Sequence, residues 1–277
     1  MLSIKNLSFS YSRKKEPVIC DFSLDIPSGG IYGLLGSNGV GKSTLLYLIS
    51  GLLTPGQGSV DYKGENPRLR LPSTISDIFL VPEEMDLPSM PLLKFVELNS
   101  PFYPNFSKEE MLANLEIFNI DPQIHLGGLS MGQKKKIILS FALAANTGLL
   151  LMDEPTNGLD IPGKGAFRSL IARHASDDRI FIISTHQVRD VEQILDHILI
   201  IDRQCVLFDQ SVAAVQNRLK FINTIDPQII NSALFAIRGP QGSSVVIPNL
   251  DGNDTEVDLE VLFSFAQENP SGLNSVF

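Results

Sequence analysis

The sequence predicts an α/β fold with a mostly parallel central sheet. Its second half contains short apolar runs without alternation, at 149–152, 180–184 and 198–201, and stretches of helical composition separate them, at 163–175 and 187–197. Such runs are typical of parallel strands that helices cover on both faces. The first half contributes the order strand, glycine-rich turn and helix, at 31–35, 36–41 and 42–50. Both observations favour a layered α/β domain.

Other elements flank this unit. Residues 2–4, 7–11 and 22–26 predict short strands of an N-terminal antiparallel β subdomain. Eight prolines interrupt 54–110, so we expect a hairpin near 59–62 and then surface segments rather than sheet. Residues 111–118 and 133–145 predict helices of an α-helical insert, which we place at about 83–145.

The composition limits the function classes. The chain has 277 residues, 43% of them hydrophobic, and a formal net charge of −9. It can bury a large core, and its acidic balance disfavours nucleic acid as a partner. The two cysteines, Cys20 and Cys205, are too few for a disulfide framework, which fits a reducing cytoplasm. We expect both side chains to be buried in the protein core. No apolar run spans a bilayer, so a membrane role requires another chain.

A phosphate-binding loop is the first motif with clear chemistry. Residues 36–44 fit the pattern G-x-x-x-x-G-K-[ST], between a predicted strand and a helix. Glycines let successive amides curl around a phosphate, and the helix directs its positive end at the phosphate. We therefore predict ATP-binding residues and Mg²⁺, with Lys42 on the β- and γ-phosphates and Ser43 on the metal. The predicted ATP contacts are Gly36, Ser37, Asn38, Gly39, Val40, Gly41, Lys42, Ser43 and Thr44.

Two carboxylates follow the strand at 149–152. A buried strand delivers its last residues to the edge of the sheet beside the phosphates. Asp153 is a candidate ligand of Mg²⁺, and Glu154 is a candidate for polarising the attacking water. Acidic residues also end many ordinary strands, so the assignment depends on the phosphate loop.

The order of the later motifs resembles the ATP-binding subunit of ABC transporters, and the resemblance covers residues 1 to about 212. It rests on Leu129-Ser130-Met131-Gly132-Gln133, then Asp153 and Glu154, then 155–160, then Ser184-Thr185-His186. It implies a P-loop NTPase whose α-helical insert carries the signature motif. It also implies that Ser130, Met131, Gly132 and Gln133 touch the ATP of a partner copy.

The resemblance assigns further roles. Glu154 becomes the catalytic base, His186 the switch residue at the γ-phosphate, Asp160 part of the loop that crosses the dimer, and Tyr11 the aromatic that stacks on adenine. Each has a structural alternative: Ser130 is also a good N-cap, and Tyr11 also suits strand packing. Lys134, Lys135 and Lys136 are interpreted as a solvated helix face.

The chain departs from the family pattern at two positions. Met131 stands where the signature usually has Gly, and Glu83 stands where a Gln usually faces Mg²⁺ and the permease. Glu83 can still accept a hydrogen bond from metal-bound water, but it adds negative charge beside three phosphates. Both substitutions resemble the branch of the family that serves export-type permeases.

We therefore predict an ATPase domain at 1–212 and an appendage of unknown role at 213–277, with a short helix at 258–267. A head-to-tail dimer would hydrolyse ATP to power a separate integral membrane permease, so the chain would be cytoplasmic and peripheral on the inner face of the cell membrane. Two alternatives stay open. One is an ABC-type ATPase that moves no solute, and the other is a nucleotide-dependent regulatory switch.

Overall fold

The central sheet has six strands in the order β5-β6-β7-β3-β8-β9, all parallel except β9. The computed structural model describes residues 1–12, 16–27, 29–202, 205–240, 242–252 and 255–277. In chain order the strands are β3 (Gly30–Leu35), β5 (Ile78–Val81), β6 (Leu149–Asp153), β7 (Ile180–Thr185), β8 (His197–Asp202) and β9 (Cys205–Ser211).

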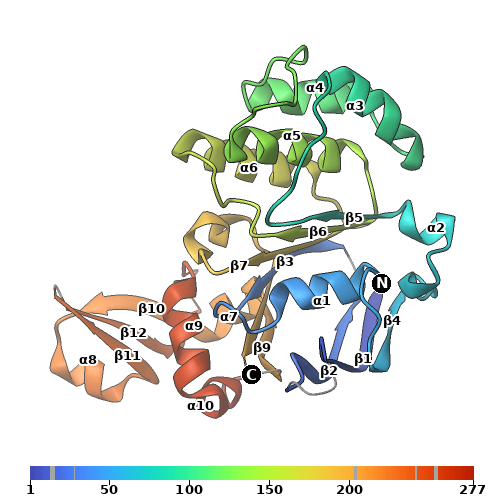
Figure 1. Ribbon diagram of the computed structural model, residues 1–277. Coiled ribbons are helices and arrows are strands. Elements are labelled where there is room, and N and C mark those ends of the chain that lie inside the picture. The colour runs from blue at the N-terminus through green and yellow to red at the C-terminus, as the bar shows by residue number, and fades with distance from the viewer. Residues whose placement is uncertain (13–15, 28, 203–204, 241, 253–254) are drawn as a thin grey trace.

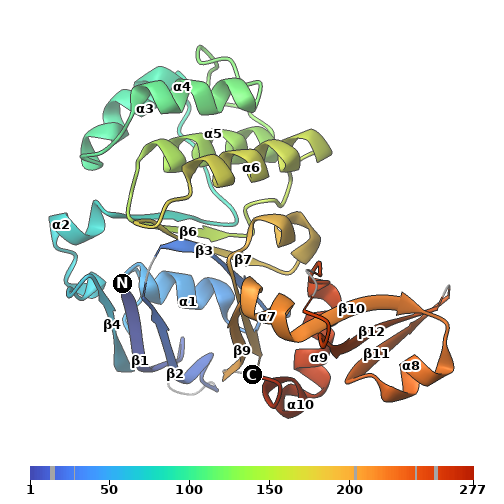
Figure 2. The ribbon, with the colours of Figure 1, turned by 180° about the vertical axis from the view of Figure 1, so that it is seen from behind.

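Each central strand contributes to two hydrophobic cores. Along β3, Ile31 and Leu35 belong to one buried cluster, whereas Tyr32 and Leu34 belong to the other. Successive side chains of a strand point to opposite faces of the sheet, so a strand without polar alternation is buried on both sides. One face is covered by α1 (Lys42–Ile49), and the other by α5 (Met131–Ala144) and α6 (Ile161–His174) (Figures 1 and 2).

The strand register brings the functional strand ends together. Leu35 of β3 pairs with Thr185 of β7, and Asp153 of β6 pairs with Ser184 of β7. Because β7 lies between β3 and β6, the ends of all three strands lie at one edge of the sheet. Residues far apart in sequence therefore meet around the loop that follows β3.

A separate antiparallel sheet lies beyond α1 (Figure 1). Its order is β2-β1-β4, with β1 (Leu2–Phe9), β2 (Ile19–Ile26) and β4 (Gln57–Tyr62). After β4 the chain forms α2 (Pro72–Ile75). Between β5 and β6 it forms α3 (Leu92–Asn99), α4 (Lys108–Ile117) and α5. These three helices occupy the range in which we expect the helical insert.

The last segment adds a third, antiparallel sheet in the order β10-β12-β11. Its elements are α7 (Val212–Arg218), β10 (Leu219–Thr224), α8 (Pro227–Ser232), β11 (Phe235–Gly239), β12 (Gly242–Pro248), α9 (Leu259–Glu268) and α10 (Pro270–Asn274). The buried face of α9 joins the same hydrophobic cluster as α5 and α6. The appendage is thus packed onto the α/β region, and α9 agrees with the predicted helix at 258–267.

Several predictions about the elements were wrong. Residues 78–81 form a strand of the central sheet, and β4 pairs with β1 rather than with a neighbouring hairpin strand. Residues 187–197 contain two short 3₁₀ turns, at Val188–Asp190 and Glu192–Ile194, and no α-helix. Cys20 and Cys205 are both exposed and do not belong to the core.

Candidate functional site

The phosphate loop, residues 36–44, leaves β3 and enters α1 with no side-chain cap on the helix. Gly39 and Gly41 have φ values of +82° and +109°, which L side chains rarely adopt. The loop can therefore turn its amides inward, and the uncapped N–H groups of α1 are available to an anion.

Lys42 lies inside this loop and is 7% exposed. Its Nζ donates to the carbonyl oxygens of Gly36 at 2.7 Å and Ser37 at 3.2 Å. Burial lowers the pKa of Lys42, while the carboxylates of Glu154, Asp153 and Glu83, in that order, oppose the shift. The ammonium group is thus held in the loop by carbonyl oxygens, next to the space that phosphates would fill.

Glu154 is buried at the end of β6 and faces Lys42 and His186. Its carboxylate accepts hydrogen bonds from Thr185 Oγ1 at 3.0 Å, from the His186 amide at 3.1 Å and from His186 Nδ1 at 2.8 Å. Lys42 Nζ lies 3.9 Å away. The backbone of Glu154 has a φ of +44°, an uncommon value for a residue with a side chain. The end of β6 therefore has an uncommon backbone conformation, which directs the Glu154 carboxylate toward the phosphate loop.

Asp153 is also buried and pairs with the neighbouring strand. The Ser184 hydroxyl donates to its carboxylate at 2.5 Å. Within the described residues no three carboxylate, His or Cys side chains converge as a metal site. A carboxylate, a serine hydroxyl and phosphate oxygens are nevertheless donors that Mg²⁺ takes in nucleotide sites. Ser43 and Asp153 therefore fit a metal that is held together with ATP.

The phosphate loop, Glu154 and His186 surround a cavity of about 400 Å³, which Asp153 does not line. Tyr11 stands at its rim, 59% exposed, with its hydroxyl 3.1 Å from Thr44 Oγ1 and its ring edge-on to Phe9. The lining residues are Tyr11, Val18, Asn38, Gly39, Gly41, Lys42, Ser43, Thr44, Glu83, Glu154 and His186. The cavity thus brings together most of the predicted ATP-binding residues, without Gly36, Ser37 and Val40, with the candidate base and the candidate switch histidine.

The signature segment, residues 129–133, does not line that cavity. Ser130 is exposed and caps α5, with its side chain accepting from the Gln133 amide and the Gln133 side chain accepting from the Ser130 amide. Gly132 approaches the Gly158 carbonyl so closely that an added Cβ would lie 2.6 Å from its oxygen. Met131 is half-exposed beside these residues. The segment therefore presents the positive end of a 14-residue helix to the outside.

Comparison with known proteins identifies the family. The family model described as "ABC transporter" matches residues 19–157. A putative ABC transporter ATP-binding protein of Listeria monocytogenes is 30% identical over 228 residues, which are 78% of this chain and 84% of the relative. The chain belongs to the ABC transporter family.

Other ABC transporter proteins match over similar lengths. The lantibiotic transport ATP-binding protein SrtF of Streptococcus pyogenes is 29% identical over 80% of this chain and 96% of its own length. The zinc uptake ATP-binding protein ZnuC of Bacillus subtilis is 30% identical over 73% of this chain and 91% of its own length.

A solved ATP-binding subunit of an ABC transporter superposes with a TM-score of 0.69 at 23% identity, covering 78% of this chain and 92% of that one. The predicted P-loop NTPase fold is thus confirmed, and the chain is an ATPase of this family.

Asp160 in this ABC ATPase lies at the start of α6. It is exposed and pairs with Lys136 of α5, the Nζ to Oδ1 distance being 2.9 Å. Lys136, the principal partner, lowers the pKa of Asp160. The predicted dimer loop is thereby tied to the helix that carries the signature segment.

Glu83 lies at the end of a hydrogen-bonded chain. Its carboxylate accepts from Asn157 Nδ2 at 3.0 Å, and Asn157 Oδ1 accepts from Gln187 Nε2 at 2.9 Å. Gln187 in turn accepts from Lys164 at 3.3 Å. Glu83 therefore connects the loop after β5 with the loops that follow Glu154 and His186.

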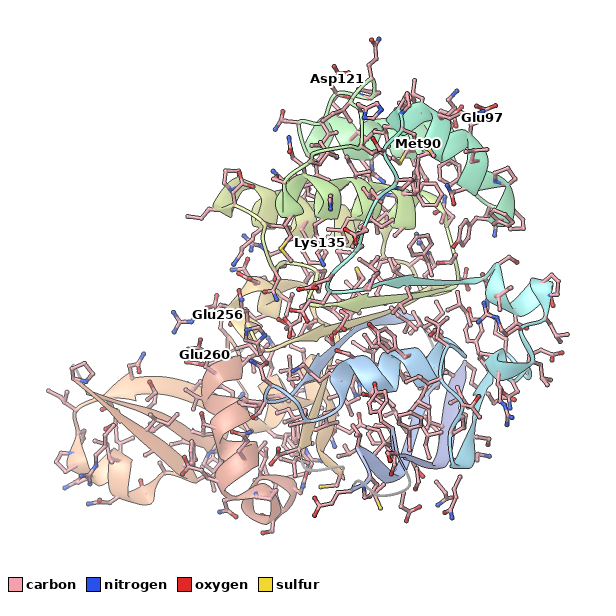
Figure 3. All side chains as sticks on the ribbon, viewed as in Figure 1. Met90, Glu97, Asp121, Lys135, Glu256 and Glu260 are labelled. Carbon is pink, nitrogen blue, oxygen red and sulfur yellow. The ribbon has the colours of Figure 1, made fainter. Side chains whose placement is uncertain are left out.

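Lys135 corrects the interpretation of the three lysines as a solvated face. This residue, labelled in Figure 3, is 1% exposed. Its Nζ donates to the carbonyl oxygens of Pro82 at 3.1 Å and Glu83 at 2.7 Å. Burial lowers the pKa of Lys135, and Glu83 is the largest opposing influence. Consecutive helix positions differ by about 100°, so Lys134 and Lys136 point elsewhere, to Asp86 and Asp160. The sequence favours the solvated face over an ATP-dependent role, and Lys135 is not among the predicted site residues.

Lys135→Met should lower ATPase turnover by about tenfold, because losing both hydrogen bonds frees the loop that carries Glu83 and small displacements near a reacting centre are costly. ATP affinity should change little, since Lys135 does not line the ATP cavity. Steady-state kinetics on the purified protein give both values. Lys134→Met is the matched control and should match wild type, because its ion pair with Asp86 is exposed. Equal turnover in the two variants would contradict a role for Lys135.

Glu83→Gln isolates the charge at this position, because a Gln side-chain oxygen can still accept from Asn157. Removing a carboxylate near the metal and phosphates should raise ATP affinity by at most about threefold, since Glu83 is solvent-exposed. It should also raise the Mg²⁺ concentration needed for half-maximal turnover. Metal titrations of the two proteins measure both effects, and curves that superimpose would remove Glu83 from the site.

Proposed function

We propose that two copies of this ABC ATPase bind two ATP molecules head to tail and hydrolyse them to drive a separate membrane permease. The supporting observation is that each copy has two incomplete half-sites. One half-site is the cavity with Lys42, Glu154 and His186, and the other is the exposed signature segment at the positive end of α5. Because these half-sites are separate within one chain, a second copy would complete both.

Different residues of the chain have different roles in the proposed reaction. The phosphate loop and Lys42 bind the triphosphate, and Tyr11 lies against the adenine. Ser43 and Asp153 would hold Mg²⁺, which would neutralise charge that develops on the phosphates. Glu154 accepts a proton from the attacking water, and His186, hydrogen-bonded to Glu154, orients this carboxylate. Ser130 and Gly132 of the partner subunit, with Asp160 at the contact, cover the γ-phosphate.

Mixing two inactive variants tests the composite sites. Lys42→Ala breaks the phosphate half-site, and Ser130→Asp keeps an effective N-cap but places a negative charge toward the partner's ATP. In a mixed dimer one site carries both changes and the other carries neither. Random exchange should therefore restore about a quarter of wild-type turnover, since half of the dimers have one intact site of two. If the mixture is as inactive as each variant alone, the result would contradict the proposed head-to-tail dimer.

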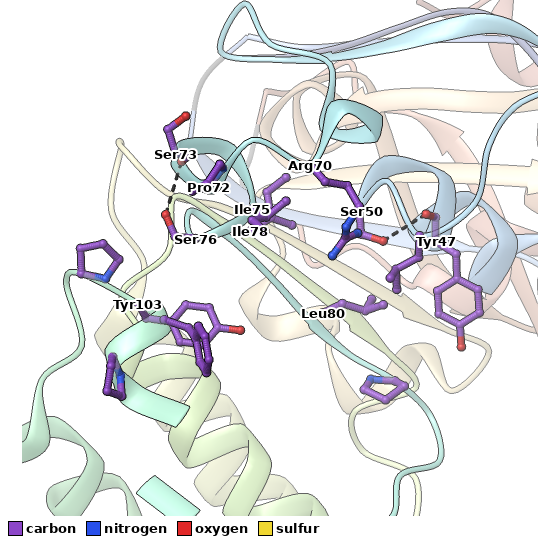
Figure 4. Close-up of a pocket in the computed structure, with 15 residues that line it drawn as sticks. Tyr47, Ser50, Arg70, Pro72, Ser73, Ile75, Ser76, Ile78, Leu80 and Tyr103 are labelled. Atoms are coloured by element: carbon purple, nitrogen blue, oxygen red, sulfur yellow. Dashed lines mark hydrogen bonds between the residues drawn. The ribbon is translucent and has the colours of Figure 1, made fainter. Parts of the chain in front are cut away.

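We also propose where the permease docks. A second cavity, of about 980 Å³, lies between β5 with its neighbouring loops and the 101–104 segment (Figure 4). Its walls are largely apolar, and Phe102 and Leu52 beside it are more than half exposed. It has no phosphate loop, so ATP belongs in the smaller cavity. Pro82, next to Glu83, lines its edge, which would let a docked element act on the Glu83 loop.

An apolar face of a cytoplasmic permease helix suits this groove. Among the described residues no helix is long and apolar enough to cross a bilayer, and relatives carry names that associate them with lantibiotic transport and with zinc uptake. The proposal therefore places the chain at the cytoplasmic membrane face and names no cargo, and the export-type branch stays a prediction. Recovery of the tagged chain with a polytopic membrane protein from detergent-extracted membranes tests this docking. Recovery of the chain alone would contradict it.

A further inference from the structure

Helix α9 of the C-terminal appendage carries two different faces. The buried face packs into the core and onto β11, where Phe265 stacks on Phe235 with ring centroids 4.9 Å apart. Its buried residues are Leu259, Val261, Leu262, Phe265 and Ala266. The second face consists of residues 260, 263, 264 and 267, at the spacing i, i+3, i+4 and i+7 of one helix stripe. This second face is turned toward the ATPase site.

One end of the stripe reaches the phosphate loop. Gln267 Nε2 donates to Ser37 Oγ at 2.8 Å, across 230 positions of sequence. Ser37 is the second residue of the loop, and its carbonyl oxygen also accepts from Lys42. The appendage therefore contacts a residue that helps to hold the phosphate-binding lysine.

The other end of the stripe reaches the segment that follows His186. Arg189 donates to Glu260 Oε2 at 2.6 Å, and this hydrogen bond raises the pKa of Arg189. Arg189 lies in the 3₁₀ turn Val188–Asp190, three residues after His186. Glu260 is labelled on α9 in Figure 3. The same helix thus contacts both chain segments that border the proposed γ-phosphate position.

A small cavity separates the two contacts. It measures about 210 Å³ and is lined by Phe263 and Ser264 of α9 on one side. The opposite side is formed by Leu35, Gly36, Ser37, Thr185, His186 and Val188. Phe263 packs against the hydrophobic cluster beside this cavity. Gln267 and Glu260, on either side of it, are polar links between α9 and the two segments.

We propose that α9 is a positioning element of the ATP site, in which Gln267 holds the phosphate loop and Glu260 holds the switch segment, 186–190. The proposal deepens the proposed function, since it assumes that ATP occupies the phosphate loop. Residues 213–277 then act on the reaction itself: a displacement of the appendage moves both borders of the γ-phosphate site. Neither residue touches the nucleotide cavity, so each acts through its partner.

Calorimetric titration of MgATP into the full chain tests the Gln267 link without requiring turnover. Gln267→Ala should weaken ATP binding by about threefold, the worth of one exposed hydrogen bond. Gln267→Glu can still accept a bond from the Ser37 hydroxyl but adds negative charge beside the phosphate loop. It should weaken binding more than Ala does, and salt should reduce the difference. Glu268→Gln, on the next exposed position of the helix, is the control and should bind as wild type does.

Hydrogen exchange tests the Glu260 link. Glu260→Ala should speed amide exchange in 186–190 by at least about threefold, because the turn loses its tie to α9. Glu256→Ala removes a nearby exposed carboxylate and should leave the exchange unchanged. Wild-type affinity in both Gln267 variants, or unchanged exchange in Glu260→Ala, would overturn the proposal. A wild-type chain that binds ATP without hydrolysing it would instead contradict the proposed function.

Discussion

Replacing Glu154 with Gln is expected to lower ATPase turnover by about 10²–10⁴-fold, the usual contribution of a general base. The carboxylate is buried and directed at the phosphate loop, and Gln has the same shape without the ability to take a proton. Its side-chain oxygen can still accept from the His186 amide, and its amide nitrogen can donate to the Thr185 hydroxyl. The fold and the ATP cavity should therefore survive, and phosphate release measures the loss.

The same variant should accumulate as an ATP-bound dimer. With hydrolysis blocked, light scattering should show a doubled mass on addition of MgATP and a monomer without it. Glu84→Gln, which neutralises an exposed carboxylate on the loop next to Glu83, is the matched control and should turn over ATP as wild type does. Undiminished turnover in Glu154→Gln would show that another group is the base.

The parts of the site that are contiguous in sequence could be predicted. Residues 36–44 determine their own conformation, because glycines at positive φ and a following helix are local properties. Asp153 and Glu154 could be placed beside them because parallel strands present their carboxyl ends at one edge. The ATP cavity contains most of the predicted ATP-binding residues together with Glu83, Glu154 and His186.

The errors arose where tertiary contacts override local signals. Residues 78–81 lie among prolines, yet pairing with β6 makes them a strand. Residues 187–197 have helical composition, but short 3₁₀ turns there place Gln187 on Asn157 and Arg189 on Glu260. Lys135 looks like its neighbours in sequence. It differs from them only because α5 packs against the loop that carries Glu83. The hydrophobic periodicity of a helix gives no information about a loop so distant in sequence.

The contacts of the appendage with the phosphate loop could not be predicted from the sequence, for a related reason. A hydrogen bond between Gln267 and Ser37 depends on the placement of every element between them. No pattern within 213–277 indicates which helix face will meet the phosphate loop. The resemblance ends at about residue 212 and the family model at residue 157, so neither assigned a role to the appendage.

Lys42→Ala is expected to weaken ATP binding by about 10²-fold, because charge-assisted hydrogen bonds to phosphate contribute about 2–3 kcal/mol. In the structure the ammonium group is already desolvated; two carbonyl oxygens accept its hydrogen bonds and the Glu154 carboxylate lies 3.9 Å away. Burial lowers its pKa, and phosphate oxygens would supply the negative charge that favours the protonated form. Alanine removes this charge and leaves Glu154, Asp153 and the triphosphate without a cation from the loop.

Thermal unfolding separates this loss of binding from a loss of folding. Without nucleotide, Lys42→Ala should unfold within about 2 kcal/mol of wild type, since Glu154 keeps its hydrogen bonds from Thr185 and His186 while the buried charge and its desolvation cost disappear. Saturating MgATP should raise the Tm of wild type by clearly more than that of the variant, because ligand stabilisation follows affinity. Lys134→Ala, a change of the same type at a partly exposed position, should retain the full shift. An equal shift in Lys42→Ala would mean that the phosphates bind without this lysine, and the assignment of the loop would be wrong.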